Sequence, residues 1–396
     1  MMYYYTDNET ADFLAGEFEK VYLLGSYDDP NNFGDIIQLK GALEFHRNLG
    51  DREPVIMLSY RAYKEDGYVE KLKKWFNCKY FIFQSHTNEP EQQWATLSPI
   101  ASFPAGGLLH VYGGGYLNKM WGEWRIQEIE YILDLFKVKD YFLSGHQIDK
   151  DTVPKLQKLF EKKAPLLVGL RDRESLSYLQ TMSIDVSAHY SFDDVTNIFL
   201  KWIAASRQDI KSFVSSGLSR KKFAIHMNMA SYTGDEQHRN DIVESIREAT
   251  AHYPALSPQV LHSYNERRPE FTKDSLGTII ELQEDFPFHA YSVINLAQMA
   301  LDINPSTNYY PQIRGILSTV EFAITCSYHT SMLMSFLDKP TYLIASNEYY
   351  RQKRAGLGYH DNLEEYLKNP ASYIKNFASD VAAHHDWLRL VERAIA

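Results

Sequence analysis

The chain has 396 residues, of which 44% are hydrophobic and 23% charged, and its formal net charge is −10 at pH 7. This composition excludes an intrinsically disordered chain, which would contain far fewer hydrophobic residues. The negative charge argues against a non-specific nucleic-acid binder, because such proteins rely on clustered cations. The length suits two domains of ordinary size.

No hydrophobic run reaches the roughly 18 residues of a membrane span. The N-terminal stretch 1–20 carries acidic residues where a secretory signal would carry basic ones followed by a hydrophobic core. We therefore expect the protein to stay in the cytosol, with peripheral contact with a membrane left open. Cys78 and Cys326 are far apart and lie near hydrophobic residues, which predicts buried free thiols rather than a disulfide or a metal pair.

The first half of the chain alternates short hydrophobic segments with amphipathic ones, and polar turns follow the hydrophobic segments. The predicted strands are residues 21–26, 54–58, 80–83, 107–112, 141–144, 165–170 and a short one near 189. The predicted helices are residues 36–48, 69–76, 123–136, 155–162 and 175–182. This alternation is typical of a doubly wound parallel sheet. Residues 84–106 are polar and rich in proline, which indicates either a lid or a surface loop.

A second cycle of the same kind begins at residue 222, after a polar helical stretch at 202–220. Its predicted strands are residues 222–228, 258–263, 322–326 and 341–345. Its predicted helices are residues 240–253, 292–299, 309–320, 331–337 and the tail from 362 to 396, whereas 277–282 is either strand or helix. We therefore predict an α/β protein with two doubly wound Rossmann-like domains that face a cleft. The expected domains are residues 1–203 and 204–375, with a C-terminal helix at 376–396 that can cross back.

Polar residues follow many of these strands, at the carboxyl edge where open α/β folds bind ligands. In the first half the candidates are Asn32, Asp35, the glycine triplet Gly113, Gly114 and Gly115, Asn118, Gln147 and Arg171. In the second half they are His226, Ser327, His329, Lys353 and Arg354.

Several of these candidates have an ordinary structural reading. Asp35 either caps its helix or contacts a ligand. The glycine triplet is either a tight turn or a backbone cradle for an anion. Arg171 either binds an anionic ligand or forms a salt bridge with Asp172 or Glu174.

The aromatic and histidine candidates also have both a structural and a functional reading. Trp121 and Trp124 are more often core-capping residues than platforms for a sugar ring. For His226 the core reading is favoured, whereas His329 is either an acid–base group or a histidine bonded to a carbonyl at a helix start. The Asp193–Asp194 pair has no histidine at metal-ligand spacing, so no metal is proposed.

Five short motifs, in this order, are similar to those of the polysaccharide pyruvyl transferase family. Asn32-Phe33-Gly34-Asp35 resembles that family's Asn-x-Gly-Asp turn, and the glycine triplet at 113–115 resembles its own. The others are Gly145-His146-Gln147, which resembles a Gly-Gln turn, Arg171-Asp172 with Ser175, and Thr325-Cys326-Ser327-Tyr328-His329 with the Lys339-Pro340 strand after it. Many relatives have Arg where this chain has Ser327, and Gly where it has Thr330.

The resemblance implies a glycosyltransferase-B-like architecture, with acceptor binding in the N-terminal domain and donor binding in the C-terminal one. It also implies transfer of pyruvate from phosphoenolpyruvate to two sugar hydroxyls, which forms a ketal in cell-surface polysaccharide biosynthesis. The partners are then phosphoenolpyruvate as co-substrate and a glycan or lipid-linked saccharide, with no cofactor and no nucleic acid.

We therefore assign expected roles to the candidates. His329 is the general acid or base, because histidine titrates near neutral pH. The donor is expected to bind Arg171, Lys353, Arg354, Ser327, Gly114 and Gly115. The acceptor is expected to bind Asn32, Asp35, Asn118 and Gln147. Two rival readings remain open, a nucleotide-sugar-dependent glycosyltransferase and an inactive glycan-binding relative. Screening of nucleotide sugars against phosphoenolpyruvate separates the first from a pyruvyl transferase, and the second predicts sugar binding without donor turnover.

Overall fold

The computed structural model describes residues 2–25, 31–50, 52–60, 67–85, 96–100, 103, 105–119, 122–207, 221–226, 236–264, 292–302 and 310–396. These residues form two compact units, each described by itself below. Unit 1 comprises Met1–Pro30, Ile37–Thr196 and Ala378–Ala396, and unit 2 comprises Asn31–Ile36 and Asn197–Phe377. The expectations for Trp121, for residues 277–282 and 208–220 and for most of the loop 84–106 concern residues outside the described ranges.

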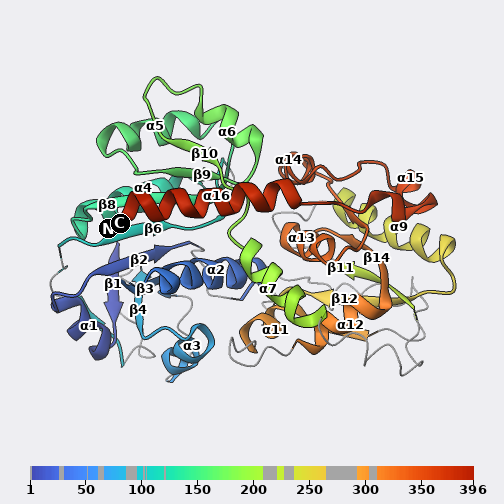
Figure 1. The fold of residues 1–396 in the computed structure, drawn as a ribbon, viewed down its shortest axis with the longest axis horizontal. Coiled ribbons are helices and arrows are strands. Elements are labelled where there is room, and N and C mark those ends of the chain that lie inside the picture. The colour runs from blue at the N-terminus through green and yellow to red at the C-terminus, as the bar shows by residue number, and fades with distance from the viewer. Residues whose placement is uncertain are drawn as a thin grey trace. The chain divides into compact units, whose positions relative to one another are not determined.

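Unit 1 is built on a sheet with the strand order β10-β9-β8-β6-β2-β3-β4-β1-β5, and β7 pairs with β8 (Figure 1). The strands are β1 (Tyr3–Thr6), β2 (Lys20–Leu24), β3 (Glu53–Ser59), β4 (Tyr80–Ser85), β5 (Ser98–Pro99), β6 (Leu108–Val111), β7 (Gly114–Leu117), β8 (Asp140–Ile148), β9 (Val168–Leu170) and β10 (Ala188–Tyr190). The run from β10 to β4 is parallel, whereas β1 is antiparallel to both β4 and β5.

The strand order of unit 1 reverses between β2 and β6. From β2 the chain adds β3 and β4 on one side, and it later adds β8, β9 and β10 beyond β6 on the other. The helices that accompany these strands are α1 (Asn8–Ala15), α2 (Phe33–Leu49), α3 (Tyr68–Phe76), α4 (Gly122–Leu135), α5 (Val153–Lys162) and α6 (Arg173–Leu179). Such a reversal point, at the carboxyl ends of the strands, is where doubly wound sheets bind their ligands.

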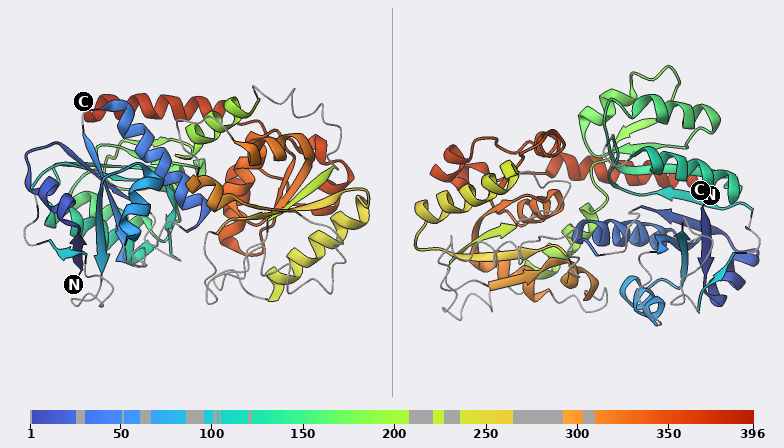
Figure 2. Two further views of the ribbon diagram at one scale, coloured as in Figure 1. Left: turned by 90° about the horizontal axis from the view of Figure 1, so that it is seen from below. Right: turned by 180° about the vertical axis from the view of Figure 1, so that it is seen from behind.

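Unit 2 contains a second sheet, with the order β13-β12-β11-β14-β15 and parallel pairing throughout. Its strands are β11 (Lys222–His226), β12 (Ser257–His262), β13 (Ser292–Asn295), β14 (Val320–Thr325) and β15 (Thr341–Leu343). Its helices are α7 (Thr196–Arg207), α9 (Glu236–His252), α11 (Leu296–Asp302), α12 (Pro311–Thr319), α13 (Tyr328–Phe336), α14 (Glu348–Leu357) and α15 (Leu363–Lys368). The order reverses between β11 and β14, and α9 and α13 cover opposite faces of the sheet (Figure 2).

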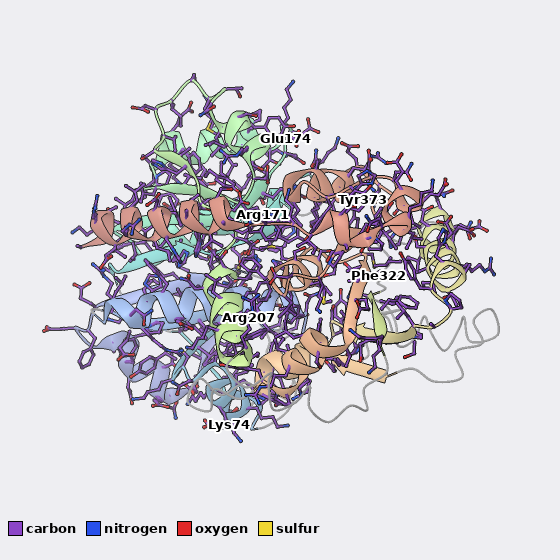
Figure 3. All side chains as sticks on the ribbon, turned by 45° about the vertical axis from the view of Figure 1, so that its right-hand side comes forward. Lys74, Arg171, Glu174, Arg207, Phe322 and Tyr373 are labelled. Carbon is purple, nitrogen blue, oxygen red and sulfur yellow. The ribbon has the colours of Figure 1, made fainter. Side chains whose placement is uncertain are left out.

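Alternate residues of β14 face the core between the sheet and the helices α9 and α15. Phe322 and Ile324 are buried there with Tyr366 of α15, and Figure 3 labels Phe322 in this region. Both faces of the central strands are covered, which explains why they read as continuous hydrophobic runs in the sequence.

The helix α7 starts earlier than the expected domain boundary at residue 203 and groups with unit 2 from Asn197 onward. Its Phe199 packs against Phe33 and Phe336, with ring centroids 6.3 and 5.6 Å away. Trp202, on the same helix, packs against Tyr310 at 6.2 Å. These aromatic contacts attach α7 to unit 2.

The prediction of a wholly helical tail from residue 362 to 396 is wrong. After α15 a 3₁₀ turn (Pro370–Tyr373) interrupts it, because Pro370 has no N–H to continue an α-helix, and α16 (Ala378–Ile395) then packs on unit 1. Tyr190 donates a hydrogen bond to the Asp380 carboxylate at 2.7 Å, and a Cβ at Gly169 would lie 2.6 Å from the Trp387 ring. Gly169 therefore leaves the space that Trp387 occupies.

Two other predicted elements differ from the structure. Residues 292–299 are not one helix, because Ser292–Asn295 pairs with β12 and Asn295 then caps α11 by accepting from the Gln298 N–H at 2.9 Å. The polar stretch after residue 144 is not a turn, since β8 continues to Ile148 through a register shift at Gly145, whose φ is +63°. The N-terminal β1 and α1 were not predicted.

Both cysteines are buried and free of disulfides, as predicted. Cys78 lies in unit 1 and Cys326 directly follows β14 in unit 2. None of the helices in the described ranges has the length and apolarity that crossing a membrane requires.

Candidate functional site

The first candidate site lies in unit 2, at the reversal point between β11 and β14. β14 ends at Thr325, whose hydroxyl accepts a hydrogen bond from the Ser327 N–H at 3.2 Å. Ser327 is the N-cap of α13, and its side chain accepts from the Thr330 N–H at 3.4 Å. The helix therefore begins at Tyr328 rather than at residue 331, and His329 belongs to its first turn instead of to a polar loop.

His329 packs against the start of α2, in the same unit. A Cβ at Gly34 would lie 2.1 Å from the His329 Nδ1, so only glycine leaves room for the imidazole in this position. His329 is half-buried. The Asn-x-Gly-Asp motif and the Ser-Tyr-His motif, almost 300 residues apart in the sequence, thus meet in three dimensions.

Asn32, rather than Asp35, caps α2. The Asn32 side chain accepts from the Gly34 N–H at 2.8 Å, and its carbonyl accepts from the Ile36 N–H at 3.0 Å. Asp35 lies in the first turn and is half-buried. The capping reading of Asp35 is therefore wrong, because the helix begins at Phe33, three residues before the predicted start at residue 36.

Two helix N-termini consequently meet beside His329. Gly34 is in the first turn of the 17-residue helix α2, and His329 is in the first turn of the nine-residue helix α13. N-terminal turns carry N–H groups without partners inside the helix and the positive end of the helix dipole. Their meeting point favours a negatively charged ligand.

A buried series of hydrogen bonds connects the end of β11 to the start of α2. His226, at the end of β11, is hydrogen-bonded to the Ser263 hydroxyl, and burial lowers the pKa of His226 to about 3. The Ser263 carbonyl accepts from the Phe33 N–H at 2.7 Å, at the start of α2. His226 is therefore a neutral core histidine, which agrees with the favoured interpretation of the sequence.

The two expected cations of unit 2 lie on α14. Lys353 is half-buried, with its Nζ 3.8 Å from the centre of the Tyr349 ring. Arg354, also half-buried, is close enough to Tyr342 to counteract the burial that raises the pKa of that tyrosine. Tyr342 is part of the core on the α9 side of the sheet, whereas α13 covers the other face.

In unit 1 the structure brings Arg171 and Gln147 together. Arg171, directly after β9, is 2% exposed and donates to the Gln147 side-chain oxygen. Its guanidinium lies 3.7 Å from the carboxylate of Asp193, which is 0% exposed. The predicted salt bridge of Arg171 with Asp172 or Glu174 is wrong, and Asp172 instead caps α6 by accepting from the Ser175 N–H at 2.7 Å. Figure 3 labels Arg171 and Glu174.

The glycine triplet of unit 1 is engaged by the protein itself. The Gly113 N–H donates to the Asp194 carboxylate at 2.9 Å, and Asn118 donates to the Gly115 carbonyl at 2.5 Å. Gly114 has a φ of +132°, a backbone conformation that favours glycine, and it begins β7. Part of the backbone expected to cradle an anion therefore holds a carboxylate of this chain.

Trp124 is the only one of the two expected tryptophans within the described ranges. It is 36% exposed, and the Arg125 guanidinium lies 4.5 Å from the centre of its ring. Arg125 in turn forms a buried ion pair with Glu128 at 2.5 Å.

The described residues contain no group of three or more His, Cys, Asp or Glu arranged to hold a metal ion.

Comparison with known proteins decides the family. The family model described as "Polysaccharide pyruvyl transferase" matches residues 32–348, which is most of the chain. The chain belongs to the polysaccharide pyruvyl transferase family. No match was found among curated proteins.

The fold of this polysaccharide pyruvyl transferase family member is also that of solved UDP-GlcNAc 2-epimerases. The structure from Methanocaldococcus jannaschii is similar with a TM-score of 0.53 and 13% identity, over 94% of this chain and 99% of that chain. The same enzyme in complex with UDP-GlcNAc and UDP gives a TM-score of 0.52 and 14% identity, with the same coverage of both chains. The predicted class, α/β with two parallel, glycosyltransferase-B-like domains, is confirmed; at this identity the likeness concerns the fold alone.

The family match begins at Asn32, the cap of α2, and extends beyond α13 to residue 348. It therefore includes Gly34 and His329, but ends before Lys353 and Arg354. The motifs that meet in unit 2 are thus inside the part of the chain that the family shares.

Replacement of Gly34 by alanine is expected to lower turnover by about 100-fold, because the new methyl group would displace the imidazole and a misplacement of about 1 Å has this effect in enzymes. Steady-state kinetics would measure the loss, and circular dichroism would check the fold. Gly315→Ala is the matched control, since a Cβ there meets nothing within 4 Å and alanine favours the helix α12. An active Gly34→Ala variant would show that the imidazole position is unimportant.

The sequence pattern does not indicate the contacts that Asp194 makes in unit 1. Asp194 was considered only as a metal ligand, yet it contacts Gly113 and Ser144 from a position beyond β10. Its signal in the sequence was weak, because an Asp after a short strand is common in turns.

Proposed function

We propose that this protein transfers pyruvate from phosphoenolpyruvate to two hydroxyls of a sugar in a glycan or glycolipid, forming a cyclic ketal. Membership of the polysaccharide pyruvyl transferase family supports the reaction class. The observation that carries the proposal is the contact between Gly34 and His329, which joins an imidazole to two helix N-termini at the reversal point of unit 2.

The chemistry of the donor matches these groups. Phosphoenolpyruvate carries a phosphate and a carboxylate, and both anions are stabilised by helix N-terminal N–H groups. Its methylene carbon must gain a proton before a hydroxyl can attack the neighbouring carbon. His329 is proposed to supply that proton, since imidazole exchanges protons near neutral pH.

Other groups are proposed to assist in the same unit. Lys353, on α14, is proposed to add positive charge toward the donor, and Arg354 is a weaker candidate because its charge acts on Tyr342. Ser327 acts through its cap of α13, which orients the first turn. Asn32 and Asp35 were expected on the acceptor side, but they group with unit 2, so we propose that they serve the reacting centre beside His329.

Arg171 is proposed to position other groups rather than to grip the donor. Its guanidinium is buried and already paired with Asp193 and Gln147, and displacing Asp193 would leave a buried carboxylate without its partner. Gln147 and Asn118 likewise make hydrogen bonds within unit 1. Gly114 and Gly115 remain candidates through their backbone.

The experiment incubates the purified chain with phosphoenolpyruvate and a panel of glycans and follows phosphate release and the pyruvate ketal by mass spectrometry. Phosphate release that depends on both substrates is the expected result. Thermal-shift measurements with phosphoenolpyruvate and with UDP-GlcNAc run in parallel. Stabilisation and turnover by UDP-GlcNAc alone would overturn the proposal in favour of a nucleotide-sugar enzyme, and glycan binding without turnover would indicate an inactive relative.

A further inference from the structure

A second set of polar groups occupies the reversal point of unit 1, between β2 and β6. Gly113 follows β6, Gln38 lies on α2, and Asp194 follows β10. These three residues, with Ser144 of β8, are called the Asp194 cluster below. Its position at the carboxyl edge beside the strand reversal is the usual ligand position of a doubly wound sheet.

Two glycines make room for the Asp194 carboxylate. A Cβ at Gly113 would lie 2.9 Å from the Asp194 Oδ2, and a Cβ at Gly145 would lie 2.8 Å from the same atom and 3.1 Å from Oδ1. The Gly113 N–H and the Ser144 hydroxyl both donate to Oδ2, at 2.9 and 2.6 Å. The carboxylate is thereby held in one orientation.

Gln38 adds a hydrogen-bond donor beside this carboxylate. Its side chain is 1% exposed, and within the described part of the chain its Nε2 has no hydrogen-bond partner. The same Nε2 would lie 2.8 Å from a Cβ at Gly113. A buried amide donor without a partner is costly, which indicates that a ligand oxygen satisfies it in the working protein.

A line of hydrogen bonds leads into Asp194 from the interior. The His46 Nε2 lies 3.0 Å from the His110 Nδ1, and the His110 Nε2 lies 2.6 Å from the Ser144 Oγ. Because the single Ser144 proton goes to Asp194, the Nε2 of His110 must carry the proton that it shares with Ser144, and its Nδ1 must accept from His46. Every donor in the line therefore points toward the carboxylate.

Both histidines of this line are neutral. Burial lowers the pKa of His46 to about 3, and burial also lowers the pKa of His110 well below its usual value. The line thus orients and polarises Ser144 without adding a charge. The Asp194 carboxylate is a buried acceptor in a fixed orientation, and the Gln38 Nε2 beside it is a buried donor that lacks a partner in the described residues. A structural role alone would not require this combination.

We propose that Asp194 is the general base of the acceptor site and that Gln38 donates a hydrogen bond to the same sugar hydroxyl. This inference rests on the proposed pyruvyl transfer. The hydroxyl oxygen forms a bond to the central carbon of the protonated donor, its O–H bond breaks, and the proton passes to the Asp194 carboxylate. In the later step the bond between the central carbon and the phosphate oxygen breaks, the second hydroxyl oxygen bonds to the same carbon, and its proton leaves with the phosphate.

The electrostatics around Asp194 are consistent with this role. Burial raises the pKa of Asp194 to about 7, with a further increase from the Asp193 charge, while hydrogen bonds from Ser144 and Gly113 oppose the rise. Arg171 lies beyond Asp193 and is paired with it, and the other groups that face Asp194 are the neutral Gln38 and, through Ser144, the neutral His110. A base of this pKa accepts a proton at neutral pH and can release it again.

The test compares the wild-type chain with Asp194→Asn, Gln38→Leu and the control Asp172→Asn in the phosphoenolpyruvate assay. The kcat of the wild type is expected to fall below about pH 7, and Asp194→Asn is expected to lower kcat at least tenfold and to remove that fall. Gln38→Leu is expected to raise KM for the glycan at least fivefold. Asp172→Asn keeps an equivalent helix cap and should leave both constants unchanged.

Thermal unfolding separates catalysis from folding. The pKa of Asp194 is near 7 in the folded state and near 4 in the unfolded state, so its contribution to stability falls as the pH rises from about 4 to about 7 and stays low above pH 7. Asp194→Asn should therefore unfold at the wild-type temperature or higher at pH 8. A lower unfolding temperature with unchanged kcat would overturn the inference and make Asp194 structural. Wild-type turnover with an equally active, stable Asp194→Asn would overturn this inference alone, whereas a wild type without phosphate release would overturn the proposed function and this inference with it.

Discussion

Replacing His329 by alanine is expected to lower kcat for phosphoenolpyruvate turnover by about 10² to 10⁴-fold, the usual contribution of a positioned general acid. His329 lies in the first turn of α13 with its imidazole against Gly34, so alanine removes the imidazole from the point where the two helix N-termini meet. The donor anions would still meet both helix N-termini. The loss is therefore expected in kcat, with KM for phosphoenolpyruvate changed less than threefold.

The control for this prediction is His360→Ala. His360 belongs to the same unit, and its Nε2 lies 3.3 Å from the Glu365 carboxylate. Its removal should leave kcat unchanged. Equal activity of wild type and His329→Ala would eliminate the imidazole from the mechanism, and a loss confined to KM would give it a role in binding only.

The replacement of Asp193 by asparagine is expected to destabilise unit 1 by about 3 to 5 kcal/mol, which is the typical effect of removing one partner from a buried ion pair. Arg171 and Asp193 are 2% and 0% exposed, so water cannot solvate the guanidinium that remains. Asparagine still accepts from the Val195 N–H, a bond of 3.2 Å in the native chain, so the change isolates the charge. Urea unfolding followed by fluorescence measures the effect.

An exposed pair provides the matched comparison. Asp386 and Arg389 on α16 pair one turn apart, with side chains 72% and 63% exposed. Asp386→Asn should cost less than about 1 kcal/mol, as surface ion pairs usually do. The double variant Asp193→Leu with Arg171→Met should recover part of the lost stability, since neither charge of this pair remains buried. A cost below about 1 kcal/mol for Asp193→Asn would show that Arg171 is not held by this carboxylate.

Local sequence patterns were sufficient for most elements of both sheets. The runs that became β2, β3 and β14 are hydrophobic because both faces of a parallel strand are covered, and this can be read without a structure. The predicted first and last residues of the elements were less accurate. α13 starts at Tyr328 because Ser327 caps it, whereas the sequence pattern predicted that this helix begins at residue 331.

The motifs of the candidate site could also be recognised in the sequence, but the residues that contact them in the structure could not. Nothing within the Asn-Phe-Gly-Asp turn shows that Gly34 makes room for an imidazole from residue 329. Arg171 was expected to pair with Asp172 or Glu174, its neighbours in sequence, and instead pairs with Asp193. Such partners depend on which strand ends lie side by side, and strand order is a long-range property.

By itself, the sequence determined that this is a two-domain α/β protein of the pyruvyl transferase family, with His329 after a buried strand, because hydrophobic periodicity and short motifs are local properties. Only the tertiary structure decided what each polar group meets. It joined Gly34 to His329, buried Arg171 against Asp193, and directed His46, His110 and Ser144 toward Asp194. The physical reason is that hydrogen bonds and close contacts act over a few ångströms, and chain segments far apart in sequence come that close only after both sheets have formed.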